Sequence, residues 1–488
     1  MARRALLILL LALGCSLFLP VGAADQSAVS PTDDEYYELY KVLVDTIDQV
    51  ERNYVQDINR REIVEAAIQG ILTKLDPYSS YISPEEMTRF RDDVEHRFGG
   101  IGIQISVQNG FLTILSPLVD TPAYRAGLRA GDVILEIEGE SAEGITIDEA
   151  VKRLKGEAGT SVTITVQHPG DDDPIEVTLE REIIAVETVL GDRRSDDDSW
   201  QWMVDPELRI GYLRVTAFSR DTSDDLRDVL EQLTAEGMRG LIIDLRFNPG
   251  GLLTTAIDVC DMFISSGRIV STEGRNTKPR TWDARPEDTF EGFPLAIIVN
   301  RYSASASEIV SACLQDHDRA VIVGERTWGK GSVQNVVELE GGASALKLTT
   351  ASYQRPSGEK IHRFPDDGDE DEWGVTPNEG YRVRLRMDEM RQLVSYRRQR
   401  DIVIFHDADE DGEIDVDLPP AEDESTPANE EGADEGDPDG EDPDRTDAEA
   451  DEESEADEID EEFVDRQLAK ALEYVVSELQ PLEAASRD

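Results

Sequence analysis

The sequence contains few of the residues that bind metals or carry histidine-based catalysis. Its 488 residues include only three cysteines and five histidines. The histidines are scattered and belong to no recognisable triad, and there is no H-E-x-x-H run or cluster of His and Cys ligands. We therefore expect neither a metal site nor a cofactor. Cys260 and Cys313 lie in apolar helical patterns and are predicted to be buried thiols rather than a disulfide framework.

Basic residues are also scarce. The chain has 48 Lys and Arg against 105 Asp and Glu, a net charge of −57. This balance argues strongly against nucleic acid or anionic lipid as a partner. Residues 407–462 hold 30 acidic residues and one basic residue, and such a segment is predicted to be disordered. Asp407 to Asp415 imitate the start of a calcium loop, but Leu418 replaces the bidentate Glu, so calcium binding stays open.

Only one long apolar run is present. Ala5 to Leu19 follows Arg3 and Arg4 and precedes the small residues Val21-Gly22-Ala23, which is the pattern of a signal peptide over residues 1–24. We expect the mature chain to be exported to the periplasm or another extracytoplasmic space. No later run is long enough to cross a bilayer, so it is not expected to be an integral membrane protein after cleavage. Cys15 offers a lipoprotein alternative, but its preceding triplet fits poorly.

Changes in composition and periodicity divide the rest of the chain. The predicted parts are an N-terminal helical region (25–97), a small module of short strands (98–185), an α/β core (186–400), the acidic segment (401–462) and a C-terminal helix (463–488). Leu39, Leu43, Ile47 and Val50 repeat at helical spacing, and we interpret this face as packing on the protein's own core. The C-terminal helix should dock on the core or pair with another subunit. A homodimer through the helical regions is the alternative for both.

The core is organised around residues 300–334. A buried strand (295–299) leads into a serine-rich turn and a helix, and a second buried strand (320–323) leads into a Gly-Lys-Gly loop. Ser305 stands at the start of the helix and Lys330 lies in the loop, which suggests a serine nucleophile with a lysine base. Ser305 and Glu308 also match an ordinary capping box. A lysine base must be neutral, so residues 320–323 and Trp328 are expected to form its dry wall.

The SASASEI and GKGSVQ runs in this region resemble the active site of the carboxyl-terminal processing proteases, also called tail-specific proteases. The resemblance implies a Ser-Lys-Gln site: Ser305 as nucleophile, Lys330 as base and Gln334 as its orienting partner. The DLRFNPGG run resembles the family's oxyanion turn, so Gly250 or Gly251 would supply one donor and Ala306 the other. The implied fold is a layered α/β core similar to the crotonase and ClpP folds, with an inserted PDZ domain.

Residues 98–185 are the predicted inserted module. Its run from Thr121 to Asp132 resembles the PDZ signature. The N–H groups of Gly99, Gly100, Ile101, Gly102 and Ile103 would bind a terminal carboxylate, and a helix over residues 147–154 would form the other wall of the groove. A plain tight turn is the alternative for the glycines. Arg181, at the exit, is interpreted as a solvated linker residue, with coupling to the active site as the alternative.

Taken together, these features predict an exported serine endopeptidase that cleaves proteins near their C-termini, with the tail recognised by the PDZ domain. A catalytically silent PDZ adaptor is the first alternative, and acyl-CoA chemistry on a crotonase-like core is the second. Export and the peptide-binding module argue against the second. Whether the PDZ domain activates or inhibits is left open by the sequence.

Overall fold

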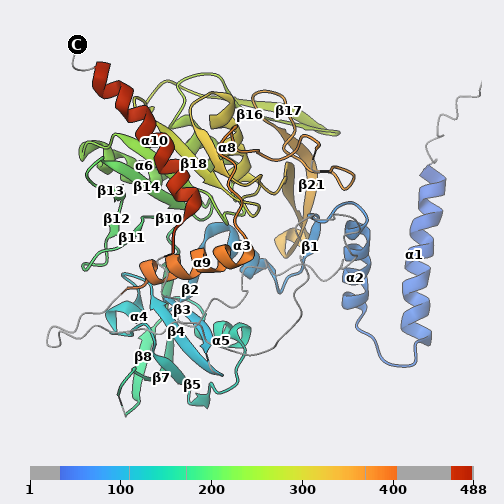
Figure 1. Cartoon of the computed structure of the whole chain (residues 1–488). Coiled ribbons are helices and arrows are strands. Elements are labelled where there is room, and N and C mark those ends of the chain that lie inside the picture. The colour runs from blue at the N-terminus through green and yellow to red at the C-terminus, as the bar shows by residue number, and fades with distance from the viewer. Residues whose placement is uncertain (1–32, 109, 172, 369, 404–462, 486–488) are drawn as a thin grey trace, which may run out of the picture. The chain divides into compact units, whose positions relative to one another are not determined.

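The computed structural model of the chain describes residues 33–108, 110–171, 173–368, 370–403 and 463–485 (Figure 1). The predicted signal peptide lies outside the described residues, as do the acidic segment from residue 404 to 462 and its calcium-like run. The chain divides into two compact units, residues 1–75 and residues 76–488. Within the described ranges, no helix has both the length and the hydropathy that a membrane span requires.

The described part of the first unit consists of two helices, α1 (Asp33–Asn53) and α2 (Arg60–Thr73). Asn59 caps α2, since its side chain accepts a hydrogen bond from the Arg61 N–H at 3.0 Å. The predicted packing of the first helix on the protein's own core concerns a contact between the two units and stays a prediction. Leu39 is 64% exposed and Leu43 is 43% exposed, so the apolar face of α1 is left largely uncovered.

The predicted PDZ-like module is a six-stranded antiparallel sheet in which β3 forms one edge (Figure 1). Alternate residues of its strands, such as Ile134, Ile164 and Val166, fill a buried core. The predicted helix over residues 147–154 is confirmed as α5, capped by Thr146. The elements are β3 (Ile103–Gln108), β4 (Phe111–Pro117), α4 (Pro122–Arg125), β5 (Val133–Ile137), β6 (Glu140–Ser141), α5 (Ile147–Leu154), β7 (Ser161–Gln167) and β8 (Ile175–Glu180). Strands β2 (Arg97–Gly100) and β9 (Glu182–Ala185) pair where the module joins the rest.

The core domain contains a six-stranded sheet in which four neighbouring strands, β14, β15, β18 and β19, run parallel, with β19 at the end of the strand order. This arrangement confirms the layered α/β core, because parallel neighbours require the helical crossovers that the sequence predicts. The strands are β10 (Val189–Leu190), β13 (Met203–Asp205), β14 (Ile210–Val215), β15 (Gly240–Asp244), β18 (Leu295–Val299) and β19 (Val321–Gly324). A short ribbon, β11 (Arg193–Arg194) with β12 (Trp200–Gln201), lies nearby in sequence.

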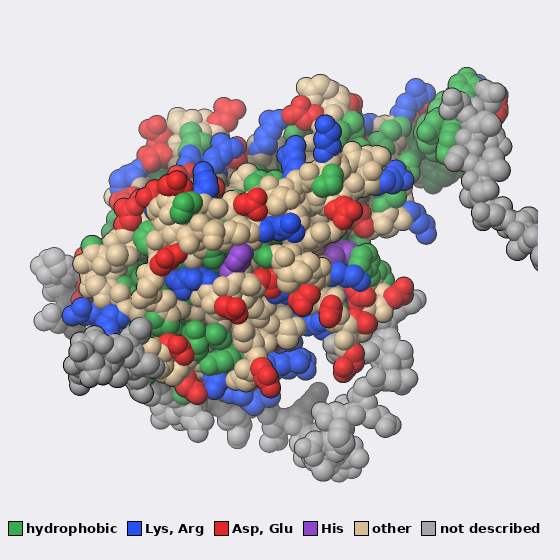
Figure 2. Space-filling model, turned by 90° about the horizontal axis from the view of Figure 1, so that it is seen from above, with side chains coloured by type: hydrophobic (Ala, Val, Ile, Leu, Met, Phe, Trp, Pro, Cys, Tyr) green, Lys and Arg blue, Asp and Glu red, His purple; other side chains and the backbone are tan. Residues whose placement is uncertain are grey.

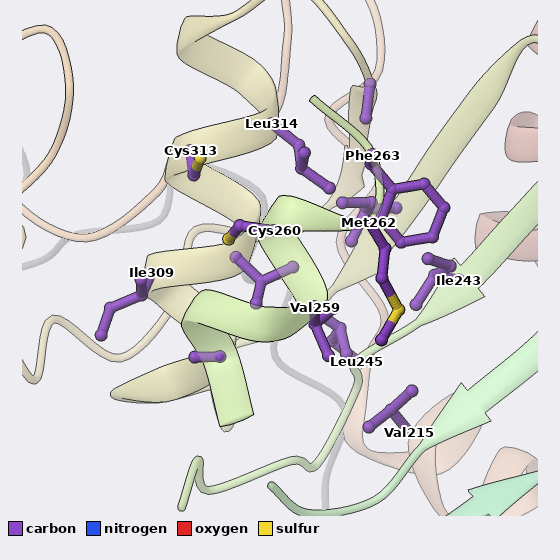
Figure 3. Packing of buried hydrophobic residues seen from close by; sticks show 14 of the residues in the cluster. Val215, Ile243, Leu245, Val259, Cys260, Met262, Phe263, Ile309, Cys313 and Leu314 are labelled. Carbon is purple, nitrogen blue, oxygen red and sulfur yellow. The ribbon is translucent and has the colours of Figure 1, made fainter. Parts of the chain in front are cut away.

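Helices cover both faces of this sheet. Ile243 of β15 packs with residues of α6 (Thr222–Ala235), α7 (Leu253–Asp261) and α8 (Ala306–Asp316), whereas its neighbour Ile242 packs with α10 (Arg466–Ala485). Figure 3 shows α7 and α8 side chains packed against those of the strands. Cys260 and Cys313 are buried there as free thiols, as predicted. The C-terminal helix docks on the core through Ala471 and Val475, which confirms the first of its two predicted alternatives.

A second, five-stranded antiparallel sheet carries the strands that flank the candidate site. It contains β1 (Ser80–Ile82), β16 (Arg268–Gly274), β17 (Thr277–Asp283), β20 (Ser332–Leu339) and β21 (Ser344–Gln354). Helix α3 (Met87–Glu95) follows β1, and α9 (Met387–Asp401) precedes the acidic segment. Strand β1 pairs with β21 with Ser80 opposite Lys347, so the chain just after residue 76 lies on the same sheet as Gln334.

Candidate active site

Ser305 lies in a strained turn between β18 and α8. Its backbone has φ 56° and ψ −111°, a region that residues with a side chain rarely occupy. The turn is held by Ser303, whose hydroxyl donates to the Leu245 carbonyl at 2.8 Å and accepts from the Asn300 N–H at 3.0 Å. Such strain persists only where the surroundings fix it. The conformation sets Ser305 at the first turn of α8, where the helix dipole is positive.

Glu308 joins the serine turn to the lysine loop. One of its carboxylate oxygens, Oε2, accepts from the Ser305 N–H and the Lys330 N–H, both at 2.8 Å. The other, Oε1, accepts from the Thr327 hydroxyl at 2.6 Å and the Gly329 N–H at 2.7 Å. Burial of this side chain raises its pKa to about 7, although these four hydrogen bonds favour the ionised form. A single carboxylate therefore fixes both backbones.

The predicted capping box between Ser305 and Glu308 is present at the start of α8. Glu308 does accept from the Ser305 N–H, as a capping glutamate would. In the opposite direction the Glu308 N–H donates to the Ser305 carbonyl oxygen at 2.9 Å. Ser305 therefore caps α8, and its chemical role stays a prediction beside this structural one.

The Asn-Pro-Gly-Gly turn after β15 lies directly against Ser305. A side chain at Gly250 would come within 2.7 Å of the Ser305 Cβ and 2.8 Å of the Ala306 nitrogen, so only glycine fits. The Gly250 N–H donates to the Asn248 side chain at 2.8 Å. By contrast, the Gly251 and Ala306 N–H groups make no hydrogen bond to another described residue. Of the two glycines predicted as alternative oxyanion donors, Gly251 is therefore the one whose N–H is available to a substrate oxygen.

Lys330 follows Gly329 in a loop that is held mainly through Glu308. Burial lowers the pKa of its amine, the nearby Lys347 lowers it further, and Glu308 opposes both. The predicted dry wall is wrong. Trp328 is 43% exposed, and Ile322 and Val323 pack against helices on the two faces of the core sheet. The Lys330 amine lies over the ring of Tyr78, whose centroid is 5.2 Å from Nζ.

Gln334 lies on β20, four residues after Lys330. Its side-chain amide nitrogen donates to the Ser332 hydroxyl at 2.8 Å and to the Thr349 hydroxyl at 3.3 Å, which leaves its carbonyl oxygen as the available acceptor. Among the described residues, no hydrogen bond joins the side chains of Ser305, Lys330 and Gln334. The structure brings the serine and lysine loops together through Glu308, and it leaves the three side chains without direct hydrogen bonds to one another.

Tyr78, Thr327 and Thr349 were not predicted as parts of the site. Thr327 lies in the stretch 300–334 that carries the predicted chemistry, whereas Tyr78 and Thr349 lie in segments for which the sequence predicts structure alone. Tyr78 lies within residues 25–97, which are predicted to form the N-terminal helical region. Their contribution depends on contacts between segments far apart in the chain, which local periodicity does not report.

The predicted carboxylate loop of the module has two parts. Gly99 and Gly100 belong to β2 and pair with β9, and the Gly99 carbonyl accepts from the Gly156 N–H at 3.0 Å. Ile101 is buried in the module's core. Gly102 has φ 79° and approaches Thr121 so closely that a side chain would collide with it. The tight-turn alternative thus holds for Gly102. Ile103 begins β3, which pairs with β4 alone among the described strands and so forms an edge of the sheet.

The interpretation of Arg181 as a solvated linker residue is wrong. Its guanidinium donates to the carbonyl oxygens of Arg153 and Leu154, both at 2.9 Å, at the end of α5. It also donates to the Ser161 carbonyl at 2.8 Å at the start of β7. Arg181 therefore ties the groove helix to the sheet of its own module.

Comparison with known proteins then identifies the family. Residues 209–379 match the model of peptidase family S41, residues 113–168 match a PDZ domain, and residues 22–86 match the N-terminal domain of the activating protease CtpB. The chain is 36% identical over 392 residues to the carboxy-terminal-processing protease of Bartonella bacilliformis, covering 77% of this chain and 85% of the relative. The chain belongs to the carboxy-terminal processing proteases.

A second relative is also a carboxy-terminal processing protease. The carboxy-terminal processing protease CtpA of Bacillus subtilis is 33% identical over 340 residues, which is 69% of each chain. Among solved structures, the photosystem II D1 C-terminal processing protease is 26% identical, covers 75% of this chain and 91% of its own, and superposes with a TM-score of 0.41. The matches to the peptidase family and to the PDZ domain, together with the two relatives, identify this carboxy-terminal processing protease as a serine-type peptidase with a PDZ domain.

Proposed function

We propose that this protease is an exported endopeptidase that cleaves proteins near their C-termini with Ser305 as nucleophile and Lys330 as general base. The observation that carries the proposal is the double role of Glu308, which holds the Ser305 and Lys330 backbones on one carboxylate oxygen. Ser305 is strained and lies at a helix start, and Lys330 has a pKa lowered by burial. Gln334 would orient the amine through its available carbonyl oxygen.

The reaction follows from these groups. The neutral Lys330 amine takes the Ser305 hydroxyl proton as Oγ attacks the scissile carbonyl carbon, and the resulting ammonium gives that proton to the leaving amine. Water then attacks the acyl-serine, with Lys330 again accepting a proton and returning it to Ser305. The N–H groups of Ala306 and Gly251 would stabilise the oxyanion. Loss of one such donor typically costs about 3 kcal/mol of transition-state stabilisation.

Substrate recognition is assigned to the PDZ domain. The edge strand β3 can add a peptide strand, and α5 forms the facing wall. Gly99 to Ile103 would supply the N–H groups for the terminal carboxylate, with Gly102 and Ile103 best placed because Gly99 and Gly100 are paired to β9. The apolar residues that line this module favour tails ending in apolar side chains.

Export rests on the signal-peptide pattern of residues 1–24. The proposed mature chain then comprises the helical region to residue 97, the PDZ domain to 185, the protease core to 400, the acidic segment to 462 and the C-terminal helix. A homodimer through the helical region is supported by the exposed apolar residues of α1, including Leu39 and Tyr40 at 64% and 66% exposure. Sedimentation of the full chain with and without charge substitutions on this face tests the dimer.

Activity assays with single variants test the proposal. Ser305→Ala and Lys330→Ala should each lower kcat by more than about a thousandfold without changing the fold, because neither step has a substitute group. Lys330→Arg should be nearly as damaging, since arginine stays charged at working pH. Lys278→Ala, an exposed lysine on β17, is the matched control and should retain turnover. Near-normal turnover by Ser305→Ala or Lys330→Ala would contradict the assignment.

A substrate pair tests the tail recognition. The same unstructured protein should be cleaved faster with a free C-terminal carboxylate than with an amidated one, because amidation removes the charge that the loop would bind. Deletion of residues 98–185 should abolish this preference. A chain that binds the free tail but cleaves neither form would instead be a PDZ adaptor, and equal cleavage of both forms would contradict recognition of the tail.

A further inference from the structure

Tyr78 brings an aromatic ring to the candidate base from far upstream in the chain. Its ring centroid lies 5.2 Å from the Lys330 Nζ, within the range of a cation–π contact. No hydrogen bond joins this amine to any other residue in the part of the chain that the structure describes. The ring face of Tyr78 is therefore the contact that most directly defines where the amine lies.

The turn that carries Tyr78 is rigidly built. The carboxylate of Asp76 accepts hydrogen bonds from the Tyr78 N–H, the Ser79 N–H and the Ser79 hydroxyl, all at 2.8 Å. Three hydrogen bonds to one short side chain fix the backbone on both sides of the aromatic residue. The position of the ring is thus set by its own turn rather than by the lysine.

The same turn is attached to the strand next to Gln334. The Thr349 N–H donates to the Ser79 hydroxyl at 3.1 Å, and the Thr349 hydroxyl donates to Asp76 at 3.2 Å. The Thr349 hydroxyl also accepts from the Gln334 amide at 3.3 Å. One network therefore connects the Tyr78 turn with the residue expected to orient Lys330, so the ring and the amide are positioned together.

The other groups around the Lys330 amine carry charges of both signs. Lys347 on β21 disfavours the protonated amine, whereas Glu308 on α8 favours it. His362 packs edge-on against Tyr78 with ring centroids 6.3 Å apart, and burial lowers the pKa of its imidazole. Asp76 lies in the turn itself. None of these groups forms a hydrogen bond with the amine, and an uncharged ring can stabilise a cation without a counter-ion.

We propose that Tyr78 is a positioning residue for the general base, whose ring face holds the Lys330 amine and stabilises the ammonium that forms when Ser305 gives up its proton. This inference rests on the proposed role of Lys330. It assigns to the segment before β1 a direct part in the active site, although that segment lies within the match to the CtpB N-terminal domain.

Substitutions that keep or remove the ring test this role. Tyr78→Phe keeps the ring face and should retain kcat within about threefold, whereas Tyr78→Leu keeps apolar cover but loses the ring face and should lower kcat by about 5- to 30-fold. Loss of the ring also removes a contact that favours the protonated amine. The acid limb of the pH–rate profile in Tyr78→Leu should therefore move to lower pH while the plateau falls, with KM little changed.

Two further measurements separate the ring effect from a packing effect. Phe364→Leu is the matched control, because Phe364 packs against His362 and not against Lys330, and it should leave both the plateau and the acid limb unchanged. If Tyr78→Leu does not fold, phenylalanines with increasing fluorination at position 78 replace it. They keep the ring's shape but weaken its negative face, so kcat should fall stepwise with fluorine number.

The outcomes are distinguishable from failure of the proposed function. Turnover by Lys330→Ala would contradict the assignment of Lys330 as the base, independently of any result at Tyr78. With Lys330→Ala inactive, a wild-type plateau and acid limb in Tyr78→Leu, or kcat independent of fluorination, would overturn the role of the ring. Equal losses in Tyr78→Phe and Tyr78→Leu would overturn it as well, since the hydroxyl would then be the essential group.

Discussion

The serine turn and the lysine loop are held in place by different means. Around Ser305, backbone and side-chain hydrogen bonds from Ser303 and Glu308 fix the chain in a strained conformation, with Gly250 in contact. At Lys330 the backbone is fixed by Glu308, whereas the amine lies over the Tyr78 ring and burial lowers its pKa. A nucleophile needs an exact direction of attack, whereas a base must stay dry and neutral. The two arrangements suit those two demands.

The charge of the protein surface does not explain why the pKa of Lys330 is lowered. Figure 2 shows acidic and basic side chains interspersed over the face in view, with no patch of one sign. The excess of acidic residues lies mostly in the segment outside the described residues. The pKa of Lys330 is therefore attributed to its immediate surroundings, which single substitutions can change.

Glu308→Gln should have the largest effect on activity, because it disturbs both the serine turn and the lysine loop. An amide has one acceptor oxygen, so its NH₂ group would face the donors on one side, either those of Ser305 and Lys330 or those of Thr327 and Gly329. We expect kcat/KM to fall by about a hundredfold, the effect of a misplacement near 1 Å. Steady-state kinetics with thermal unfolding in parallel measures it.

The control for this substitution is Glu372→Gln, an exposed glutamate that should show wild-type kinetics. Wild-type kcat/KM in Glu308→Gln would mean that the shared carboxylate is not what holds the two loops.

Asp465→Asn should weaken the serine side alone. Asp465, at the start of α10, pairs at 2.6 Å with Arg246, whose side chain is fully buried two residues before Asn248. Asparagine can still cap α10 but leaves part of a buried charge uncompensated, so we expect a loss of about 3 kcal/mol in the free energy of unfolding. The fall in kcat should be smaller than that for Glu308→Gln. Urea unfolding measures the first and kinetics the second.

A neighbouring ion pair provides the reference. Arg466 pairs with Glu389 at 2.8 Å, but its side chain is half exposed, and Arg466→Ala should cost less than about 1 kcal/mol. Equal free energies of unfolding for Asp465→Asn and Arg466→Ala would show that the buried Arg246–Asp465 pair stabilises the fold no more than the exposed pair does.

The local parts of the fold could be predicted from the sequence. The strand at 295–299 and the helix at 147–154 match the structure residue for residue, because apolar runs and caps are short-range signals. The position of Ser305 at a helix start follows from the same signals. The ends of less strongly marked elements were less accurate: the strand expected at 320–323 begins at Val321.

What the sequence could not predict depends on contacts between distant segments. The sequence neighbours of Lys330 are expected to form the wall around it, yet Trp328 is 43% exposed and the ring over the amine comes from Tyr78. Glu308 was recognised as a cap, but its bonds to the Lys330 loop need the two segments to be folded together. Arg181 looked like a linker residue because the carbonyl groups it binds belong to a helix end and a strand far from it in sequence.

The pH dependence of kcat/KM tests the central claim most directly, since only a neutral Lys330 can accept the Ser305 proton. Burial lowers the pKa of this amine, so its neutral form becomes populated at a lower pH than for a free lysine. With a free-tail substrate and the wild-type enzyme, measured from about pH 5 to about pH 10, kcat/KM should rise through an apparent pKa well below the ordinary lysine value of about 10.4 and then level off. A profile that follows the titration of an unperturbed lysine, and so reaches no plateau in this pH range, would contradict the buried-base account.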